Sequence, residues 1–546
     1  MRRTNLIFLF SLLLSLFQIT SLSAKEDEGI LYYKVGYLEQ AKNMLEAELA
    51  SASGDKAAQL CYYLGNIYFK QNQPEKAAEY YNKGLSYNEK DPLNAIGLSK
   101  LQIKSNPTEA AEQLKSIQKK NKKNMLVAEE IGRAYLDNKE PEAALEYQTI
   151  VYEKDFQFAP GYILWGDIFD FKSEPGDAAA KYEMAITCDP ASYDAYVKYA
   201  RVINHVNMDA AIEKLQALKE QEPSLSIVNK ELSELYYKKN DFTNAAKAYS
   251  EYIAAGNYTN DDLKQYAVTL LFAGDNAKSL EIAKKGLAKD PTDPAFCRMV
   301  MYNLVDLQQY EEAAIAADNF FKKSKNPEFS YFDYMYLGRL YDAQKKFADA
   351  AEAYMKAVEK DPSKKQLYQM ASQSYEEAGD IAKSLELYEK FVNDSEGGKN
   401  ADNLMDLGRK YYRMASNVDS TSSFTKEDML KKAIATFSEV SVLEPDNYRS
   451  FYWIGNAASS LDPEARDVVA RDNYTKAYEI MKSKEDPRYN SNIAVAAKYL
   501  AVYYYMVNER TKNDADKENS IKYAKEVLSI DPNDATSKQI IEIFSK

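Results

Sequence analysis

One pattern of glycine, alanine and aromatic residues recurs along this 546-residue chain and limits what it can fold into. The clearest copy consists of Tyr334, Leu337, Gly338, Tyr341, Ala350, Tyr354 and Pro362. Its first four positions follow the i, i+3, i+4, i+7 spacing of one helix face. The same offsets recur around Gly166 and Gly65. The pattern therefore predicts pairs of helices that are repeated along the chain.

The residue types in the pattern indicate how the two helices of one copy pack. Small residues, at Gly338 and Ala350, allow two helix backbones to approach closely. Tyr341 and Tyr354 fill the space beside this contact, and Pro362 ends the second helix because proline lacks a backbone N–H. One pair cannot bury its apolar face alone, so neighbouring pairs are expected to stack.

This arrangement resembles the tetratricopeptide repeat, a helix-turn-helix unit of about 34 residues. Three further copies are centred on Gly132, Gly408 and Gly455, and the last two contain insertions. Weaker copies are marked by Ala110, Ala211, Ala245, Gly286, Ala313, Ser384 and Val527. The resemblance implies an all-α fold, a right-handed α-solenoid (superhelix) of about a dozen repeats.

The repeats are expected to occupy residues 25–546, nearly the whole chain. The extra residues after Gly408 predict an insertion loop at about 416–428. At the other end, residues 535–546 place apolar side chains on one helix face and predict a capping helix for the last repeat.

Residues 1–24 have the composition of a secretory signal peptide. Two arginines precede an apolar run from Leu6 to Phe17, and small residues at Ser23 and Ala24 suit cleavage after either of them. An uncleaved membrane anchor is the alternative, but the run is shorter than the roughly 18 apolar residues that a membrane span needs. We therefore expect a periplasmic or secreted protein with no transmembrane span after cleavage.

Disulfides are common in exported proteins, and this chain has three cysteines, Cys61, Cys188 and Cys297. More than a hundred residues separate each from the next, and an odd number cannot all pair. In a helical stack they would lie several repeats apart, far beyond the roughly 7 Å between Cα atoms that a disulfide allows. We therefore expect free cysteines.

The charge and the reactive side chains exclude several classes of function. The formal net charge is −13, so binding to nucleic acid is not expected without a local basic patch. His205 is the only histidine, which removes multi-histidine metal sites and Ser-His or Cys-His pairs. The stretch from Ser423 to Lys426 matches an S-x-x-K motif but has no partner motifs. We predict no catalytic residues, no metal and no cofactor.

Function is therefore expected to lie in surface shape. In tetratricopeptide proteins the first helix of each pair lines a concave groove that holds a peptide or a partner protein, and the resemblance implies the same here. The composition and leader are similar to those of exported repeat proteins of Bacteroidota. The resulting hypothesis is a non-catalytic interaction scaffold or adaptor of the bacterial cell envelope. The alternatives are a structural spacer of an envelope assembly and an enzyme with a carboxylate-only site.

A candidate partner-binding set follows from aligning each copy on its glycine. Positions −6, −3, +1, +4 and +5 from the glycine lie on the helix face turned away from the packed stripe, and Met335 and Met405 fall among them. Arginine forms bidentate bonds to carboxylates and tyrosine adds apolar area, so such a set suits an extended acidic or aromatic peptide. The alternative is that each arginine pairs with a neighbouring carboxylate. The predicted partner-binding residues are Phe332, Arg339, Arg409, Tyr412, Arg413, Arg449, Tyr452 and Asn456.

Overall fold

The computed structural model describes residues 28–417 and 424–545, and its regular structure is helical throughout these residues. The prediction of an all-α fold is confirmed. The predicted signal peptide, residues 1–24, lies outside the described residues, as does part of the predicted insertion loop. The chain divides into two compact units, Met1–Asn303 and Leu304–Lys546.

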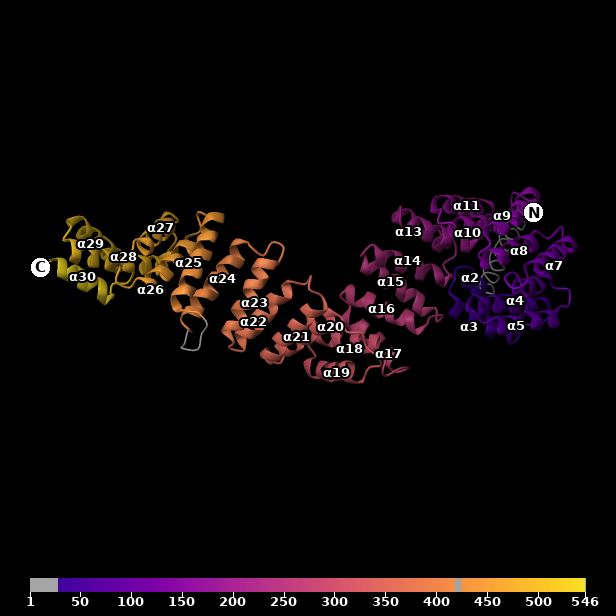
Figure 1. The fold of residues 1–546 in the computed structure, drawn as a ribbon, viewed down its shortest axis with the longest axis horizontal. Coiled ribbons are helices and arrows are strands. Elements are labelled where there is room, and N and C mark those ends of the chain that lie inside the picture. Colours follow the sequence, from indigo (N-terminus) through magenta and orange to yellow (C-terminus); the bar gives the residue numbers. More distant parts are fainter. Residues whose placement is uncertain (1–27, 418–423, 546) are drawn as a thin grey trace, which may run out of the picture. The chain divides into compact units, whose positions relative to one another are not determined.

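Unit 1 consists of consecutive antiparallel helix pairs, in which each even-numbered helix packs against the odd-numbered helix that follows (Figure 1). Proline is the first residue of many of these helices. An N–H group in the first turn has no partner within the helix, so proline, which lacks this group, loses no hydrogen bond there. The helices are α2 (Glu28–Lys34), α3 (Leu38–Leu49), α4 (Gly54–Lys70), α5 (Pro74–Tyr87), α6 (Pro92–Lys100), α7 (Pro107–Lys120), α8 (Met125–Asp137), α9 (Pro141–Lys154), α10 (Ala159–Phe171), α11 (Pro175–Cys188), α12 (Tyr193–Ile203), α13 (Met208–Gln221), α14 (Ser226–Lys238), α15 (Phe242–Ala254), α16 (Asn260–Phe272), α17 (Asn276–Leu287) and α18 (Pro294–Asp306), whose last residues belong to unit 2.

Unit 2 continues with the same kind of pairs, from α20 with α21 to α28 with α29. The last helix, α30, packs against both α28 and α29 and buries Ile540. The helices are α19 (Tyr310–Lys323), α20 (Tyr331–Ala343), α21 (Phe347–Lys360), α22 (Gln366–Glu377), α23 (Ile381–Asp394), α24 (Ala401–Ala415), α25 (Lys426–Leu443), α26 (Tyr448–Leu461), α27 (Val469–Ser483), the short 3-10 helix η1 (Pro487–Tyr489), α28 (Asn490–Thr511), α29 (Asp514–Ile530) and α30 (Ala535–Ser545).

The glycine of each clear copy marks a close contact between the two helices of a pair. A Cβ atom built on Gly338 would lie 2.5 Å from the ring of Tyr354, sixteen residues later. The rings of Tyr81 and Tyr182 stand in the same way against Gly65 and Gly166. The predicted stripe is therefore confirmed, and any side chain at these glycines would displace the ring.

The three cysteines are free thiols. Cys61 and Cys297 are buried and Cys188 is half-buried, so they pack as small apolar residues.

Candidate functional site

The first helices of the pairs in unit 1 (α4, α6, α8, α10, α12, α14 and α16) form a surface rich in paired charges, which we call the first-helix face of unit 1. Asp167 on α10 lies at its centre and accepts hydrogen bonds from Arg133 Nη1 on α8, at 2.7 Å, and from Lys198 Nζ on α12, at 2.6 Å. Burial raises the pKa of Asp167, but the charges of Lys198 and Arg133 outweigh it and hold the pKa below its ordinary value. One carboxylate thus joins three successive first helices.

A second carboxylate makes the same kind of bridge. Asp137 on α8 bonds Lys70 of α4 through Oδ1, at 2.7 Å, and Lys100 of α6 through Oδ2, at 2.5 Å. Lys100 is almost completely buried and also donates a 2.9 Å hydrogen bond to Asn66. Because burial disfavours the charged ammonium, the pKa of Lys100 is lowered despite the attraction of Asp137. Of the two cations, Lys100 is the one whose buried charge depends on the attraction of Asp137.

Glu129 on α8 is the most perturbed carboxyl group of this face. It is buried and pairs with Arg133, which lies one helical turn further along. Burial, opposed only in part by Arg133, raises its pKa to about 8. A perturbed buried carboxyl group can mark a functional site, but it also arises in structural ion-pair networks, and Glu129 belongs to such a network.

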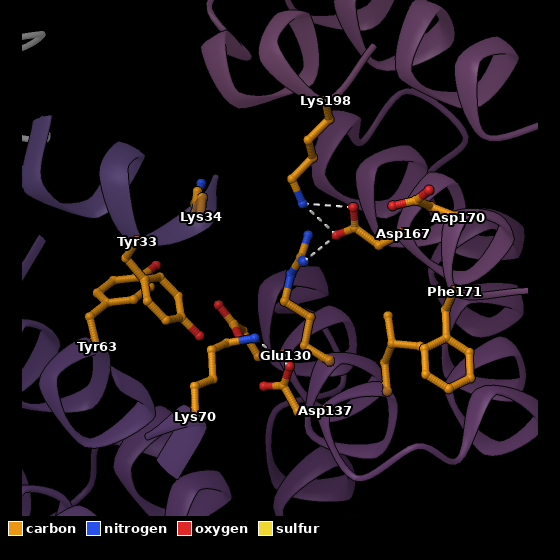
Figure 2. A pocket seen from close by; sticks show the side chains of 12 residues that line it. Tyr33, Lys34, Tyr63, Lys70, Glu130, Asp137, Asp167, Asp170, Phe171 and Lys198 are labelled. Atoms are coloured by element: carbon orange, nitrogen blue, oxygen red, sulfur yellow. Dashed lines mark hydrogen bonds and ion pairs between the residues drawn. The ribbon is translucent and has the colours of Figure 1, made fainter. Parts of the chain in front are cut away.

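Both bridging carboxylates, Asp137 and Asp167, line a cavity of about 310 Å³ (Figure 2). Lys198 points to Asp167 on one side, and the rings of Tyr33 and Tyr63 lie on the opposite side. The carboxylates of Asp137 and Asp167 already bond two cations each. Chemically, the lining offers hydrogen bonds and aromatic surface, with most of its charge already neutralised within the protein.

The first pair of unit 1, α2 with α3, extends across this face and contacts helices far along the chain. Tyr32 hydrogen-bonds Ser226 at 2.8 Å, and Gln40 donates to Asp262 at 3.0 Å. The guanidinium of Arg201 on α12 donates to the backbone carbonyl of Val35. The first-helix face of unit 1 is therefore partly covered by the chain's own first pair.

This pair is not among the copies predicted from the sequence, although its signal is present. Gly29 precedes Ala41 by the same twelve residues that separate glycine from alanine in the clear copies. Leu45 then stands where those copies have an aromatic residue, and it contacts the position of a Cβ on Gly29 at 3.0 Å. The copy therefore becomes visible in the sequence once leucine is accepted at the aromatic position.

In unit 2, the four predicted arginines lie on the first helices α20, α24 and α26, and α22 between α20 and α24 carries no arginine. Arg339 on α20 bonds Asp306 at 2.8 Å and lies over the ring of Tyr336. Arg409 on α24 bonds Asp406 one turn away, and Arg413 bonds Glu376 of α22. Arg449 is exposed at the start of α26, and no ion pair of its side chain occurs within the described part of the chain. Three of the four arginines thus pair with carboxylates, as the alternative interpretation expected.

Two of the predicted aromatic residues share one cluster, and the third is apart from them. The ring centroids of Tyr412 on α24 and Tyr452 on α26 lie 5.4 and 6.3 Å from that of Trp453. Both tyrosines are half-buried. Phe332 on α20 is exposed and stacks on Tyr331, with 4.2 Å between the ring centroids.

Asn456 has an internal role. Its side-chain oxygen accepts a 2.5 Å hydrogen bond from the hydroxyl of Tyr474. Asn66 accepts from Tyr81 and Asp167 from Tyr182 in the same way, one residue after the glycine. Position +1 therefore helps to hold the aromatic ring of the second helix.

The placement of Met405 on the exposed lining was wrong. Met405 is buried in one hydrophobic cluster with Tyr388 and Phe391 of α23, whereas Met335 and Tyr452, at position −3 of their own copies, are half-buried. Tyr62 and Glu129, at the same position in unit 1, are buried as well.

Within residues 28–417 and 424–545, no group of three or more His, Cys, Asp and Glu side chains could hold a metal ion. His205 lies exposed in the turn between α12 and α13. No described helix combines the length and the apolar content that crossing a membrane requires.

Comparison with known families identifies the repeat. A tetratricopeptide repeat profile matches residues 58–91, and a second one matches residues 302–365 and 337–403. The chain carries tetratricopeptide repeats. The first match contains the contact of Gly65 with Tyr81, and the second contains that of Gly338 with Tyr354. No curated protein has a significant match to the sequence.

Several solved structures are similar to this tetratricopeptide chain. The C-terminal part of a TPR repeat-containing protein from Cytophaga hutchinsonii is 20% identical, covers 51% of this chain and 98% of its own, and has a TM-score of 0.38. A tetratricopeptide repeat protein from Parabacteroides merdae is 15% identical, with 46% and 98% covered and a TM-score of 0.31. The APC/C hetero-tetramer Cut9-Hcn1 is 15% identical, with 91% and 97% covered and a TM-score of 0.31. At these values the similarities carry no information about partner or location.

Proposed function

We propose that this tetratricopeptide protein is a non-catalytic scaffold of the bacterial cell envelope that holds a peptide or protein partner on the first-helix face of unit 2. That face is formed by α20, α22, α24, α26 and α28. The observation that carries the proposal is the contrast between the two units. In unit 1 the first pair and the bridged carboxylates already occupy the first-helix face. In unit 2, by contrast, Phe332 and the three arginines Arg409, Arg413 and Arg449 of that face are exposed, and Tyr412 and Tyr452 are half-buried.

The arginine pairs of unit 2 are of a kind that a partner can exchange. The side chains of Arg409 and Arg413 are 47% and 55% exposed, and the carboxylate that pairs with Arg409 is 53% exposed. Exposed ion pairs contribute little net stability, so a carboxylate of a partner can replace Asp406 at small cost. Tyr412 and Tyr452 add apolar surface with a hydroxyl group, which suits an acidic peptide that contains aromatic residues.

The test replaces Arg339, Arg409, Arg413 and Arg449 by glutamine. Binding is measured by fluorescence anisotropy with a synthetic peptide of glutamate and tyrosine, and by capture of partners from envelope extract. The variant is expected to lose most binding in both assays and to keep the melting temperature of the wild type. A matched control replaces four exposed cations of unit 2 that lie on none of the helices of this face, Lys322, Lys431, Arg466 and Arg488, and removes the same charge. Binding that survives in the four-arginine variant, or is lost equally in the control, contradicts the proposal.

The export part of the proposal rests on the leader-like composition of residues 1–24. Expression in a Gram-negative host should place the protein in the periplasmic or extracellular fraction. N-terminal sequencing should find the mature chain beginning at Ala24 or Lys25. An intact leader in the cytoplasmic fraction would contradict export and leave the binding assays unaffected.

A further inference from the structure

A group of unpaired lysines lies at the ends of α7 and α9, two second helices of unit 1, and in the turn that follows α7. Between Glu112 and Glu129 the chain carries five lysines and neither aspartate, glutamate nor arginine, in a protein of net charge −13. All five are exposed, at the end of α7 and in the turn to α8, and the described residues make no ion pair with any of them. Lys154, at the end of α9, joins them by donating a 3.3 Å hydrogen bond to the carbonyl of Lys122. We call Lys115, Lys119, Lys120, Lys122, Lys123 and Lys154 the lysine patch.

Helix stability explains only part of this patch. Lys119 and Lys120 lie in the last turn of α7, where a positive charge interacts favourably with the helix dipole. Lys115 lies outside that turn and faces Lys119 at a spacing of four residues, so the two like charges repel each other. Lys122 and Lys123 follow the end of the helix. The charge gathered here is therefore larger than the fold needs.

An exposed aromatic ring adjoins the lysine patch. Phe156 is 63% exposed and follows Lys154 by two residues. The nearby carboxylates are Glu112, Glu153 and Asp155, and Asp155 is engaged by the backbone N–H of Gln157. The surface thus combines flexible cations with an exposed aromatic ring that can be transferred from water into an apolar environment.

We propose that the lysine patch, with Phe156, docks this chain on an anionic phospholipid surface. Lysine is a compact, hydrated charge on a flexible stem and suits a diffuse anionic surface, whereas directional binding of carboxylates or phosphates favours arginine, which this segment lacks. Lysines beside a membrane attract acidic lipids, and an exposed aromatic side chain inserts among the head groups. The proposal does not rest on the first-helix face of unit 2, because it uses different residues.

Sedimentation of residues 25–546 with lipid vesicles tests the proposal. The wild type should bind vesicles that contain phosphatidylglycerol, should not bind phosphatidylcholine alone, and should be released by high salt. Each lysine near an anionic surface changes affinity by about fivefold. Replacing Lys119, Lys120, Lys122 and Lys123 by glutamine should therefore weaken binding by about a hundredfold or more. The matched control replaces exposed lysines that are paired with carboxylates, Lys322, Lys323, Lys431 and Lys512, and should bind like the wild type.

The variant Phe156→Ser distinguishes binding to a lipid surface from binding to a soluble polyanion. It should weaken vesicle binding severalfold and leave binding to polyglutamate or DNA unchanged. The four-arginine variant of unit 2 should bind vesicles like the wild type, which distinguishes this proposal from the preceding one. Failure of the wild type to bind phosphatidylglycerol vesicles at low salt overturns the proposal, as does equal binding by the lysine variant. Patch-dependent binding of DNA or polyglutamate without vesicle binding assigns the patch to another partner and overturns it too.

Discussion

The hydroxyl of Tyr37 donates a 2.8 Å hydrogen bond to the carboxylate of Glu231, 194 residues further along the chain. It also reaches Glu234 at 3.2 Å, while the cations of Arg201 and Lys230 lie over its ring. In a simple repeat array each repeat contacts only its neighbours. Unit 1 departs from this rule, because its first pair is bonded to α12, α14 and α16.

This long-range contact predicts a long-range effect. Replacing Tyr37 by alanine should increase amide hydrogen exchange in α14, because the local stability of that helix depends on the first pair. The milder variant Tyr37→Phe should cost about 1.5–3 kcal/mol of unfolding free energy, the usual value of a hydrogen bond to a charged group. Mass spectrometry of exchanged peptides measures the first effect. Tyr87→Ala, at the exposed end of α5, is the control and should affect only its own repeat. Unchanged exchange in α14 would show that the contact is energetically unimportant.

The two tryptophans allow the two units to be followed separately. Trp165 lies in unit 1 and Trp453 in unit 2, and the chain has no others. In a Trp453→Phe background, Asp137→Asn should lower the unfolding free energy of unit 1 by about 3–5 kcal/mol, since it leaves the buried charge of Lys100 without its partner. Urea unfolding followed by Trp165 fluorescence measures this loss. Asp209→Asn, which breaks the exposed pair with Lys239, should change little. Equal effects of the two variants would contradict the account of the bridged carboxylates.

Local spacing carried the prediction of the fold, and long-range geometry limited the prediction of the site. Gly338 and Tyr354 lie within one repeat, sixteen residues apart, so the spacing of the sequence was enough to predict their contact. The bond of Tyr37 to Glu231 depends on small rotations between pairs that add up over six repeats, and no short segment encodes their sum. Met405 was misplaced for a related reason, since burial of one helix face depends on the pair stacked against it. The pairing of Arg413 with Glu376, on the preceding first helix, follows from the same stacking.

The close contact at Gly338 predicts the effect of a single methyl group. Gly338→Ala would place a Cβ 2.5 Å from the ring of Tyr354, which must then shift, at a cost of about 1–3 kcal/mol. Gly176→Ala is the control, because no other group lies within 4 Å of a Cβ at that helical position. There the higher helix propensity of alanine should stabilise unit 1 by up to about 1 kcal/mol. Urea unfolding, followed by Trp453 for the first variant and by Trp165 for the second, measures both changes. A neutral Gly338→Ala would show that the ring has room to move.

The raised pKa of Glu129 predicts how the stability of unit 1 depends on pH. Its pKa is 4.5 in the unfolded chain and about 8 in the folded protein, where burial favours the protonated acid. The folded state therefore binds this proton more tightly, and the associated stability is complete below pH 4.5 and is lost as the pH rises to about 8. Glu129→Gln resembles the protonated acid at every pH. The difference in unfolding free energy between wild type and variant should thus shift in favour of the variant across this window, by no more than about 1.4 kcal/mol per pH unit. Urea unfolding at a series of pH values, with Trp165 as the only tryptophan, measures the difference. A difference in unfolding free energy that is independent of pH would mean that Arg133 keeps Glu129 ionised throughout.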